Sequence, residues 1–257
     1  MFRDLAPVGK RVMRIGLAPN FGIDADSVAH ALADRGVNYI FWTPLMRKAT
    51  PAIRDALARD REQYVLATGP TTAYWGGSLR RFTERVLRSL GTDYIDVLHM
   101  FWLGVGSRWS PATVEELVRL KEEGKARAIA VSIHDRQRAG ALATDSPLDL
   151  LMIRYNAAHP GAEQDIFPSL RDDGPAVIAY TATAWRRLLK APRGWDGRVP
   201  TAGDCYRFCL SNPYVDVVLS GPANREQLEL NLASIEQGMM TREELDWMYR
   251  FGEVVHG

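Results

Sequence analysis

The sequence predicts an α/β protein of the (β/α)8 TIM-barrel class, and three observations support this. The chain has 257 residues, a length typical of one such barrel. Eight short apolar segments recur at fairly even spacing, with helical patterns between them. One helix–turn–strand unit, residues 78–102, is especially clear. We therefore expect a single barrel domain over residues 1–257, with a doubly wound open sheet as the alternative.

The clearest unit reads SLRRFTERVLRSLGTDYIDVLHMFW, from Ser78 to Trp102. Ser78 is expected to cap a helix, and Gly91 stands where a left-handed residue ends it. The following run, residues 94–101, is apolar on both faces, as in a buried strand of a parallel sheet. The apolar face of the helix is formed by Leu79, Phe82, Val86, Leu87 and Leu90.

The other elements follow the same alternation. Asp24 or Asp26 is expected to cap a helix that stops at Gly36, and Ser110-Pro111 begins another that ends at Gly124. Two helices close the chain, at residues 224–235 and at residues 241–255, the second opening with a capping box. The eight predicted strands span residues 11–18, 37–43, 63–69, 93–101, 126–132, 148–156, 176–182 and 215–221.

Composition narrows the class of protein. A net charge of +1 argues against a nucleic-acid binder that depends on phosphate contacts. The sequence shows no signal peptide and no apolar run near the roughly 20 residues of a membrane helix, so we expect a cytoplasmic protein. Cys205 and Cys209 have no further Cys or His at ligand spacing, and they indicate two reduced thiols rather than a metal site. The sequence does not indicate an oligomeric state.

In a barrel the functional site forms at the carboxyl ends of the strands. The side chains predicted there form an aromatic pocket with few polar groups, which is typical of a site for a small molecule. They are Trp42, Tyr74, His99, Phe101, Trp102, Ser132, His134, Arg154 and Tyr180.

Each polar candidate also has a purely structural interpretation. His99 is either a core histidine or a functional one. His134 either donates a proton or, with Asp135, caps the next helix. An inward Arg154 meets an acidic partner or binds an anionic ligand, since an unpaired buried charge is costly. Tyr74 follows the third predicted strand, where it can serve as a proton donor.

The segment SLGTDYIDVLHMF resembles the central signature of the aldo-keto reductases, in which a tyrosine-isoleucine-aspartate strand ends in a catalytic histidine. The likeness covers nearly the whole chain. It continues in VAHALADRGVNY (28–39), LVRLKEEGKARAIAVSIH (117–134) and NPYVDVVLSGPANREQLELNL (212–232). This resemblance implies a barrel that reduces small carbonyl compounds with NADP(H), with a tyrosine as general acid and a lysine, an aspartate and a histidine tuning its pKa.

The same resemblance implies that all four catalytic positions are substituted here. The family's aspartate, tyrosine, lysine and histidine fall, in that order, on Phe41 or Trp42, Met46 or Arg47, Gly69, and Phe101.

The positions that the resemblance assigns to the cofactor are partly kept. It places Ser132 at the nicotinamide carboxamide and Tyr180 as the ring that stacks on the nicotinamide. Ile133 and Met152 stand where the family has hydrogen-bonding side chains. The adenosine end is matched by Gly221, Gln227 and Asn231, with Arg225 as a replacement that can hold a 2′-phosphate.

Three hypotheses follow. The first, which we favour, is an NADP(H)-dependent oxidoreductase with a new proton donor drawn from His134, Tyr74 or Tyr180. The second is a lyase or isomerase that uses His134 and Arg154, and the third is a non-catalytic ligand-binding barrel. The candidate catalytic residues are therefore His134, Tyr74, Arg154 and His99, and the candidate pocket residues are Trp42, Phe101 and Trp102.

Overall fold

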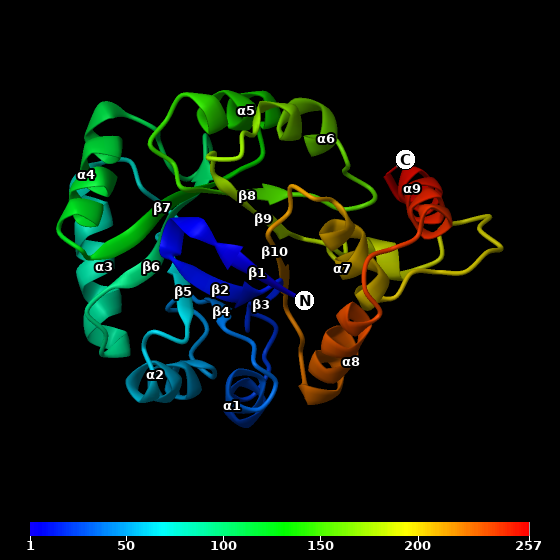
Figure 1. The fold of residues 1–257 in the computed structure, drawn as a ribbon, viewed down its shortest axis with the longest axis horizontal. Coiled ribbons are helices and arrows are strands. Elements are labelled where there is room, and N and C mark those ends of the chain that lie inside the picture. The colour runs from blue at the N-terminus through cyan, green and yellow to red at the C-terminus, as the bar shows by residue number, and fades with distance from the viewer. Residues whose placement is uncertain (257) are drawn as a thin grey trace.

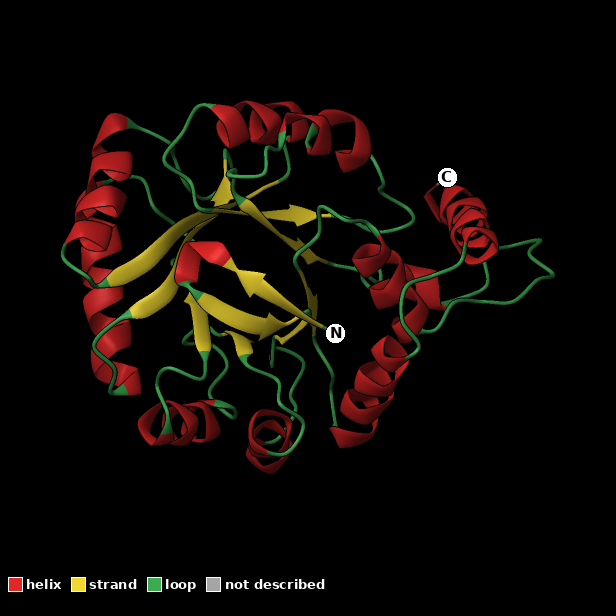
Figure 2. Ribbon diagram, viewed as in Figure 1, coloured by secondary structure: helices red, strands yellow, loops and turns green. Residues whose placement is uncertain are grey.

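The computed structural model describes residues 1–256, and its centre is a closed barrel of eight parallel strands (Figures 1 and 2). The barrel order is β10-β3-β4-β5-β6-β7-β8-β9, so that consecutive strands are neighbours all the way round. This confirms the predicted fold class. The strands are β3 (Ile15–Leu17), β4 (Tyr39–Phe41), β5 (Val65–Thr68), β6 (Ile95–Leu103), β7 (Ala126–Ile133), β8 (Leu150–Arg154), β9 (Ala176–Tyr180) and β10 (Val217–Ser220).

Helices surround the barrel, and Figure 1 shows α9 outside this ring, beyond α7. The α-helices are α1 (Ala25–Ala33), α2 (Thr50–Arg59), α3 (Gly76–Leu90), α4 (Pro111–Glu122), α5 (Arg136–Thr144), α6 (Ala162–Asp165), α7 (Ala202–Ser211), α8 (Arg225–Glu236) and α9 (Arg242–His256). Three short 3-10 turns are η1 (Ala6–Val8), η2 (Phe167–Ser169) and η3 (Arg187–Leu189).

The prediction of one strand over residues 11–18 is wrong. Its first half belongs to a separate antiparallel hairpin of β1 (Phe2–Leu5) and β2 (Lys10–Met13), and only β3 enters the barrel. Leu5, Val8 and Val12 of this hairpin are buried in the same cluster as the barrel interior. The hairpin therefore closes the end of the barrel at which the strands begin (Figure 1).

Most predicted helix ends are confirmed. Asp24 accepts a hydrogen bond from the backbone N–H of Ser27, and Ser110 forms a capping box with Thr113. Gly91 has a left-handed φ of 65° after α3. Ser78 is not a cap, however, because α3 begins at Gly76 and the Ser78 hydroxyl donates to the carbonyl of Trp75.

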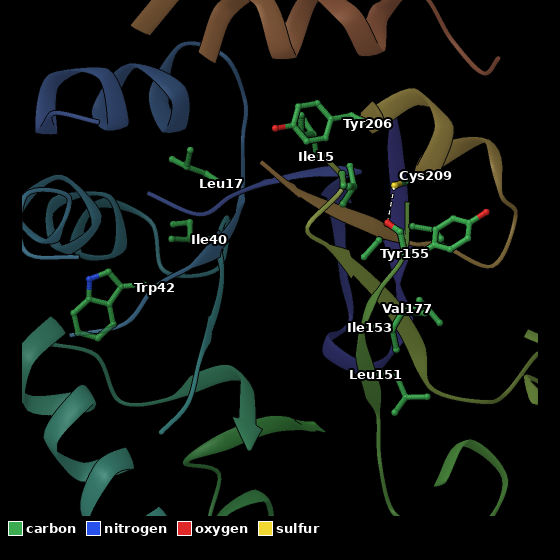
Figure 3. Packing of buried hydrophobic residues seen from close by; sticks show 14 of the residues in the cluster. Ile15, Leu17, Ile40, Trp42, Leu151, Ile153, Tyr155, Val177, Tyr206 and Cys209 are labelled. Atoms are coloured by element: carbon green, nitrogen blue, oxygen red, sulfur yellow. Dashed lines mark hydrogen bonds between the residues drawn. The ribbon is translucent and has the colours of Figure 1, made fainter. Parts of the chain in front are cut away.

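Side chains that alternate along each strand divide the core into two layers. Inward residues such as Val97, Ala130 and Ile178 fill the barrel together with the hairpin. Outward residues pack against the helices, and Figure 3 shows part of this outer layer. The two thiols lie in it, buried in α7, where Cys209 Sγ donates to the Tyr155 carbonyl at 3.2 Å.

A buried carboxylate joins the hairpin to the barrel. Asp96 is fully buried in β6, and its oxygens accept from Lys10 Nζ at 2.8 Å and from Arg61 Nη2 at 2.6 Å. A third hydrogen bond comes from the Leu66 N–H at 2.9 Å. The aspartate of the Tyr-Ile-Asp motif is therefore a structural residue at the closed end of the barrel.

We expect Asp96→Asn to destabilise the fold by about 3 to 5 kcal/mol, because it leaves two cations without their shared partner. Urea denaturation measures this change. The control is Asp93→Asn, which removes an exposed carboxylate just before β6 and should change the free energy of unfolding by about 0.5 kcal/mol or less. Equal midpoints for the two variants would contradict the structural role of Asp96.

Candidate active site

The strand ends at the open mouth of the barrel carry inward side chains of two kinds. Phe101 belongs to the interior cluster, and Phe41 and Tyr180 pack against it. Ser132 and Arg154 follow interior residues of their own strands at a spacing of two, so they face the same way. One side of the mouth, at β4 and β6, is aromatic, and the opposite side, at β7 to β9, is polar.

The aromatic side is built from Phe41, His99 and Phe101. The rings of His99 and Phe101 stack with centroids 5.2 Å apart, and Phe41 lies 5.4 Å from Phe101 and 6.3 Å from His99. Phe101 is only 6% exposed. Two positions at which the family resemblance places catalytic residues are thus occupied by packed apolar rings.

Gly69, the position matched to the family's lysine, has no space for a side chain. A Cβ atom there would lie 2.0 Å from the carbonyl oxygen of His99 and 2.9 Å from its Cβ. Because the obstacle is backbone, it cannot move aside as a flexible side chain can. The close approach of β5 and β6 is incompatible with a lysine at this position.

His99 is fully buried, and neither ring nitrogen has a hydrogen-bond partner among the described residues. Burial lowers the pKa of its imidazole to about 3. His99 is therefore a neutral core residue, and it cannot supply a proton to the mouth near neutral pH.

The polar side is built around Tyr180, whose hydroxyl lies 3.1 Å from His134 Nε2 and 3.3 Å from Nδ1. Arg154 pairs with Tyr180 in the register of β8 and β9. Burial raises the pKa of Tyr180 to about 12, while the charge of Arg154 opposes the rise. Burial also lowers the pKa of His134, and the same arginine adds to that effect. The three strand ends therefore bring together a hydroxyl, an imidazole and a guanidinium.

Three other expected site residues lie elsewhere. Tyr74 is exposed, and its hydroxyl donates to the carbonyl of Val105 at 3.1 Å. Trp42 does not line the pocket, because it is buried in the outer layer and its indole donates to Thr50 (Figure 3). Trp102 is at the rim, half exposed, with a left-handed φ of 51°, and its N–H donates to the hydroxyl oxygen of Ser132.

The residues matched to the adenosine end surround the start of α8. Arg225 and Gln227 are exposed in its first turn, and Gln227 Oε1 accepts from the Ala223 N–H. Asn231 is buried and donates to Ser220 at 3.1 Å. The loop after β3 covers Gly221 so closely that a Cβ there would lie 2.7 Å from the ring of Phe21.

Sequence reasoning missed His159, which lies in the loop after β8. Its Nδ1 is 3.1 Å from Asn156 Oδ1, while the Asn156 amide donates to the Thr181 carbonyl and ties this loop to the end of β9. Burial and nearby positive charges lower the pKa of His159 to about 4. The only available signal was a histidine three residues beyond a strand-end asparagine.

The model of the aldo/keto reductase family matches residues 20–192. The chain belongs to this family. It is 32% identical over 106 residues to the NADH-specific methylglyoxal reductase of Escherichia coli (strain K12), a match that covers 40% of this chain and 32% of that enzyme. It is 24% identical to the L-galactose dehydrogenase of Arabidopsis thaliana, over 91% of this chain and 88% of that protein.

Solved aldo-keto reductases share the fold. The holo form of AKR11C1 from Bacillus halodurans has a TM-score of 0.81 at 20% identity, covering 97% of this chain and 95% of that one. An aldo/keto reductase from Klebsiella pneumoniae in complex with NADP and acetate has a TM-score of 0.71 at 23% identity, covering 95% and 93% of the two chains. Within residues 1–256, no helix is long and apolar enough to cross a membrane, and no three potential metal ligands cluster.

His99 gives a testable pH dependence. Its pKa of about 3 in the folded chain lies below the ordinary value of about 6.5, so the unfolded chain takes up this proton first as the pH falls. Stability is therefore lost between about pH 6.5 and pH 3. At about pH 4.5 the loss due to His99 is about 2 to 3 kcal/mol relative to neutral pH, or two pH units at about 1.4 kcal/mol each.

We expect His99→Phe to remove this part of the acid destabilisation, since phenylalanine does not titrate and can stack on Phe101. Urea denaturation of both chains at neutral pH and at about pH 4.5 measures the difference. If both chains lose the same free energy of unfolding on acidification, the conclusion that His99 is buried and neutral is wrong.

Proposed function

We propose that the chain is an NADP(H)-dependent oxidoreductase of small carbonyl compounds. In this proposal Tyr180 donates the proton to the substrate, and His134 and Arg154 assist the transfer. The supporting observation is the Tyr180 hydroxyl, held 3.1 Å from His134 Nε2 at the barrel mouth beside Arg154. These groups replace the family's tyrosine, histidine and lysine in chemical kind, although they stand on different strands.

The protonation states suit this role. With a pKa near 12, Tyr180 keeps its proton at neutral pH and gives it up readily to an alkoxide, which is far more basic. The positive charge of Arg154 favours the resulting tyrosinate. His134 is exposed and its lowered pKa keeps it neutral, so its ring can accept from the hydroxyl and exchange a proton with solvent. Tyr180 is then reprotonated from solvent.

The residues present fit the two ends of a nicotinamide dinucleotide. Arg225 and the free amide of Gln227 lie in the first turn of α8, where backbone N–H groups and the helix dipole favour a phosphate. The Ser132 hydroxyl accepts from Trp102 N–H and keeps its own hydrogen for a carboxamide. Asn231 is committed to Ser220 and does not take part. NADP(H), when bound, supplies or accepts the hydride.

Tyr180→Phe tests the proton donor. The variant keeps the ring and loses only the hydroxyl, so the affinity for NADPH should remain, while kcat for carbonyl reduction should fall by about 10²- to 10⁴-fold. Stopped-flow and steady-state kinetics with methylglyoxal measure both quantities. The matched control is Tyr74→Phe, whose hydroxyl is bonded to Val105 and whose kcat should be unchanged. An unchanged kcat in Tyr180→Phe would assign the proton to another group.

Arg225→Gln tests the cofactor. If Arg225 holds the 2′-phosphate, the variant should bind NADPH roughly tenfold to a hundredfold more weakly and NADH with unchanged affinity. Tryptophan fluorescence titration of the purified chain measures both affinities, with the exposed Arg85→Gln in α3 as control. If neither cofactor binds the unaltered chain at millimolar concentration, the redox proposal fails.

A further inference from the structure

The loops after β7, β8 and β9 gather cationic side chains on the polar side of the mouth. Arg154 ends β8, and His159 follows it in the next loop. Arg136 starts α5 after β7, and Arg187 starts η3 after β9. The ring of His256, at the end of α9, contacts the ring of His159 with centroids 5.0 Å apart. Several cationic side chains therefore gather on one side of the mouth.

Arg154 is the cation in this group without a partner. Arg136 pairs with Asp165 at 2.6 Å, and Arg187 donates to the carbonyl of Val255. Within residues 1–256, Arg154 makes no hydrogen bond or ion pair, although it is partly buried. Glu163 does not serve it, because that carboxylate accepts from the hydroxyls of Tyr155 and Tyr249. A desolvated guanidinium without a counterion is costly unless a ligand supplies the charge.

His159 is oriented to assist. Asn156 Oδ1 accepts from the Ala158 N–H and faces His159 Nδ1, which places the Nδ1 hydrogen on that bond. The other nitrogen, Nε2, is left for a ligand. The charges acting on His159, from Arg154, His256, Arg187 and Arg136, are all positive, so an anion that enters favours the protonated ring.

We propose that the substrate is a small 2-oxo acid whose carboxylate binds Arg154 and His159 while its ketone oxygen accepts from the Tyr180 hydroxyl. Arg154 and Tyr180 are register partners on adjacent parallel strands, which lie about 4.8 Å apart. The anionic group and the reacting carbonyl must therefore be close together in the substrate. A 2-oxo acid, in which they are adjacent, meets this requirement.

This inference rests on the proposed function. In the reaction the carbonyl carbon gains a hydride from NAD(P)H and the oxygen gains the proton of Tyr180, which His134 restores from water. A 2-hydroxy acid and NAD(P)⁺ are the products, so charge and electrons balance. The cofactor phosphate is assigned to Arg225 at the start of α8, which leaves Arg154 for the substrate.

The test compares pyruvate with methylglyoxal, which has the same carbon skeleton but no carboxylate. The unaltered chain should have the higher kcat/KM for pyruvate. Arg154→Met should lower kcat/KM for both substrates, because it also removes the charge that favours the tyrosinate. The loss for pyruvate should exceed the loss for methylglyoxal by roughly 10- to 100-fold, as expected for a charged hydrogen bond to the carboxylate. Arg154→Lys should lie between, because it keeps the charge without the planar fork. Arg85→Gln should match the unaltered chain for both substrates.

Calorimetric titration with oxamate, an unreactive analogue of pyruvate, and with inorganic phosphate separates the two proposals. If oxamate binds in the absence of cofactor, and Arg154→Met and His159→Gln both weaken that binding, the carboxylate site is supported. This holds even if no carbonyl is reduced and the redox proposal fails. Reduction of methylglyoxal without oxamate binding or pyruvate turnover overturns the 2-oxo acid while the redox proposal stands. A preference for phosphate over oxamate, or displacement of NADPH by oxamate, also overturns it.

Discussion

The close contact between β5 and β6 determines what the mouth of this barrel can hold. At Gly69 the chain passes so near the carbonyl of His99 that even one Cβ atom cannot fit. The neighbouring inward positions are then filled by rings that pack on one another, Phe41, His99 and Phe101. The side of the mouth at β4 to β6 is thereby filled by apolar packing, and the polar candidate groups stand at the ends of β7, β8 and β9.

Two histidines show the consequence of this division. Burial lowers the pKa of both. Among the described residues His99 has no hydrogen-bond partner and is fully buried, whereas His134 contacts the Tyr180 hydroxyl and is exposed. A buried imidazole without partners contributes packing and sensitivity to acid. An exposed one beside a hydroxyl can move protons. Position relative to the aromatic cluster, rather than residue type, separates the structural histidine from the candidate catalytic one.

The sequence was sufficient for the barrel because apolar strand segments alternate with helical patterns along the whole chain. It also placed His134, Arg154 and Tyr180 at strand ends, which is where the structure has them. The prediction from sequence failed where it depended on which of two neighbouring strand residues faces the barrel interior. Trp42 lies one position from Phe41, and in a strand that step moves a side chain from the interior to the outer layer. The hairpin before β3 was missed because Val12 and Met13 of its second strand are buried and lie just before the barrel strand, so the two strands read as one segment.

The hydrophobic periodicity of the sequence does not predict which loops contact one another at the mouth of the barrel. The Asn156 amide ties the loop after β8, which carries His159, to the end of β9, and Arg187 follows β9 in the next loop. Every strand of a barrel ends at the same rim, so a hydroxyl, an imidazole and a cation can be provided by any three neighbouring strands. The substitution of four catalytic positions that the family resemblance implies therefore leaves other strand ends from which a proton can be transferred. In this chain, the ends of β7, β8 and β9 bring together the His134 imidazole, the Arg154 guanidinium and the Tyr180 hydroxyl that we propose for this role.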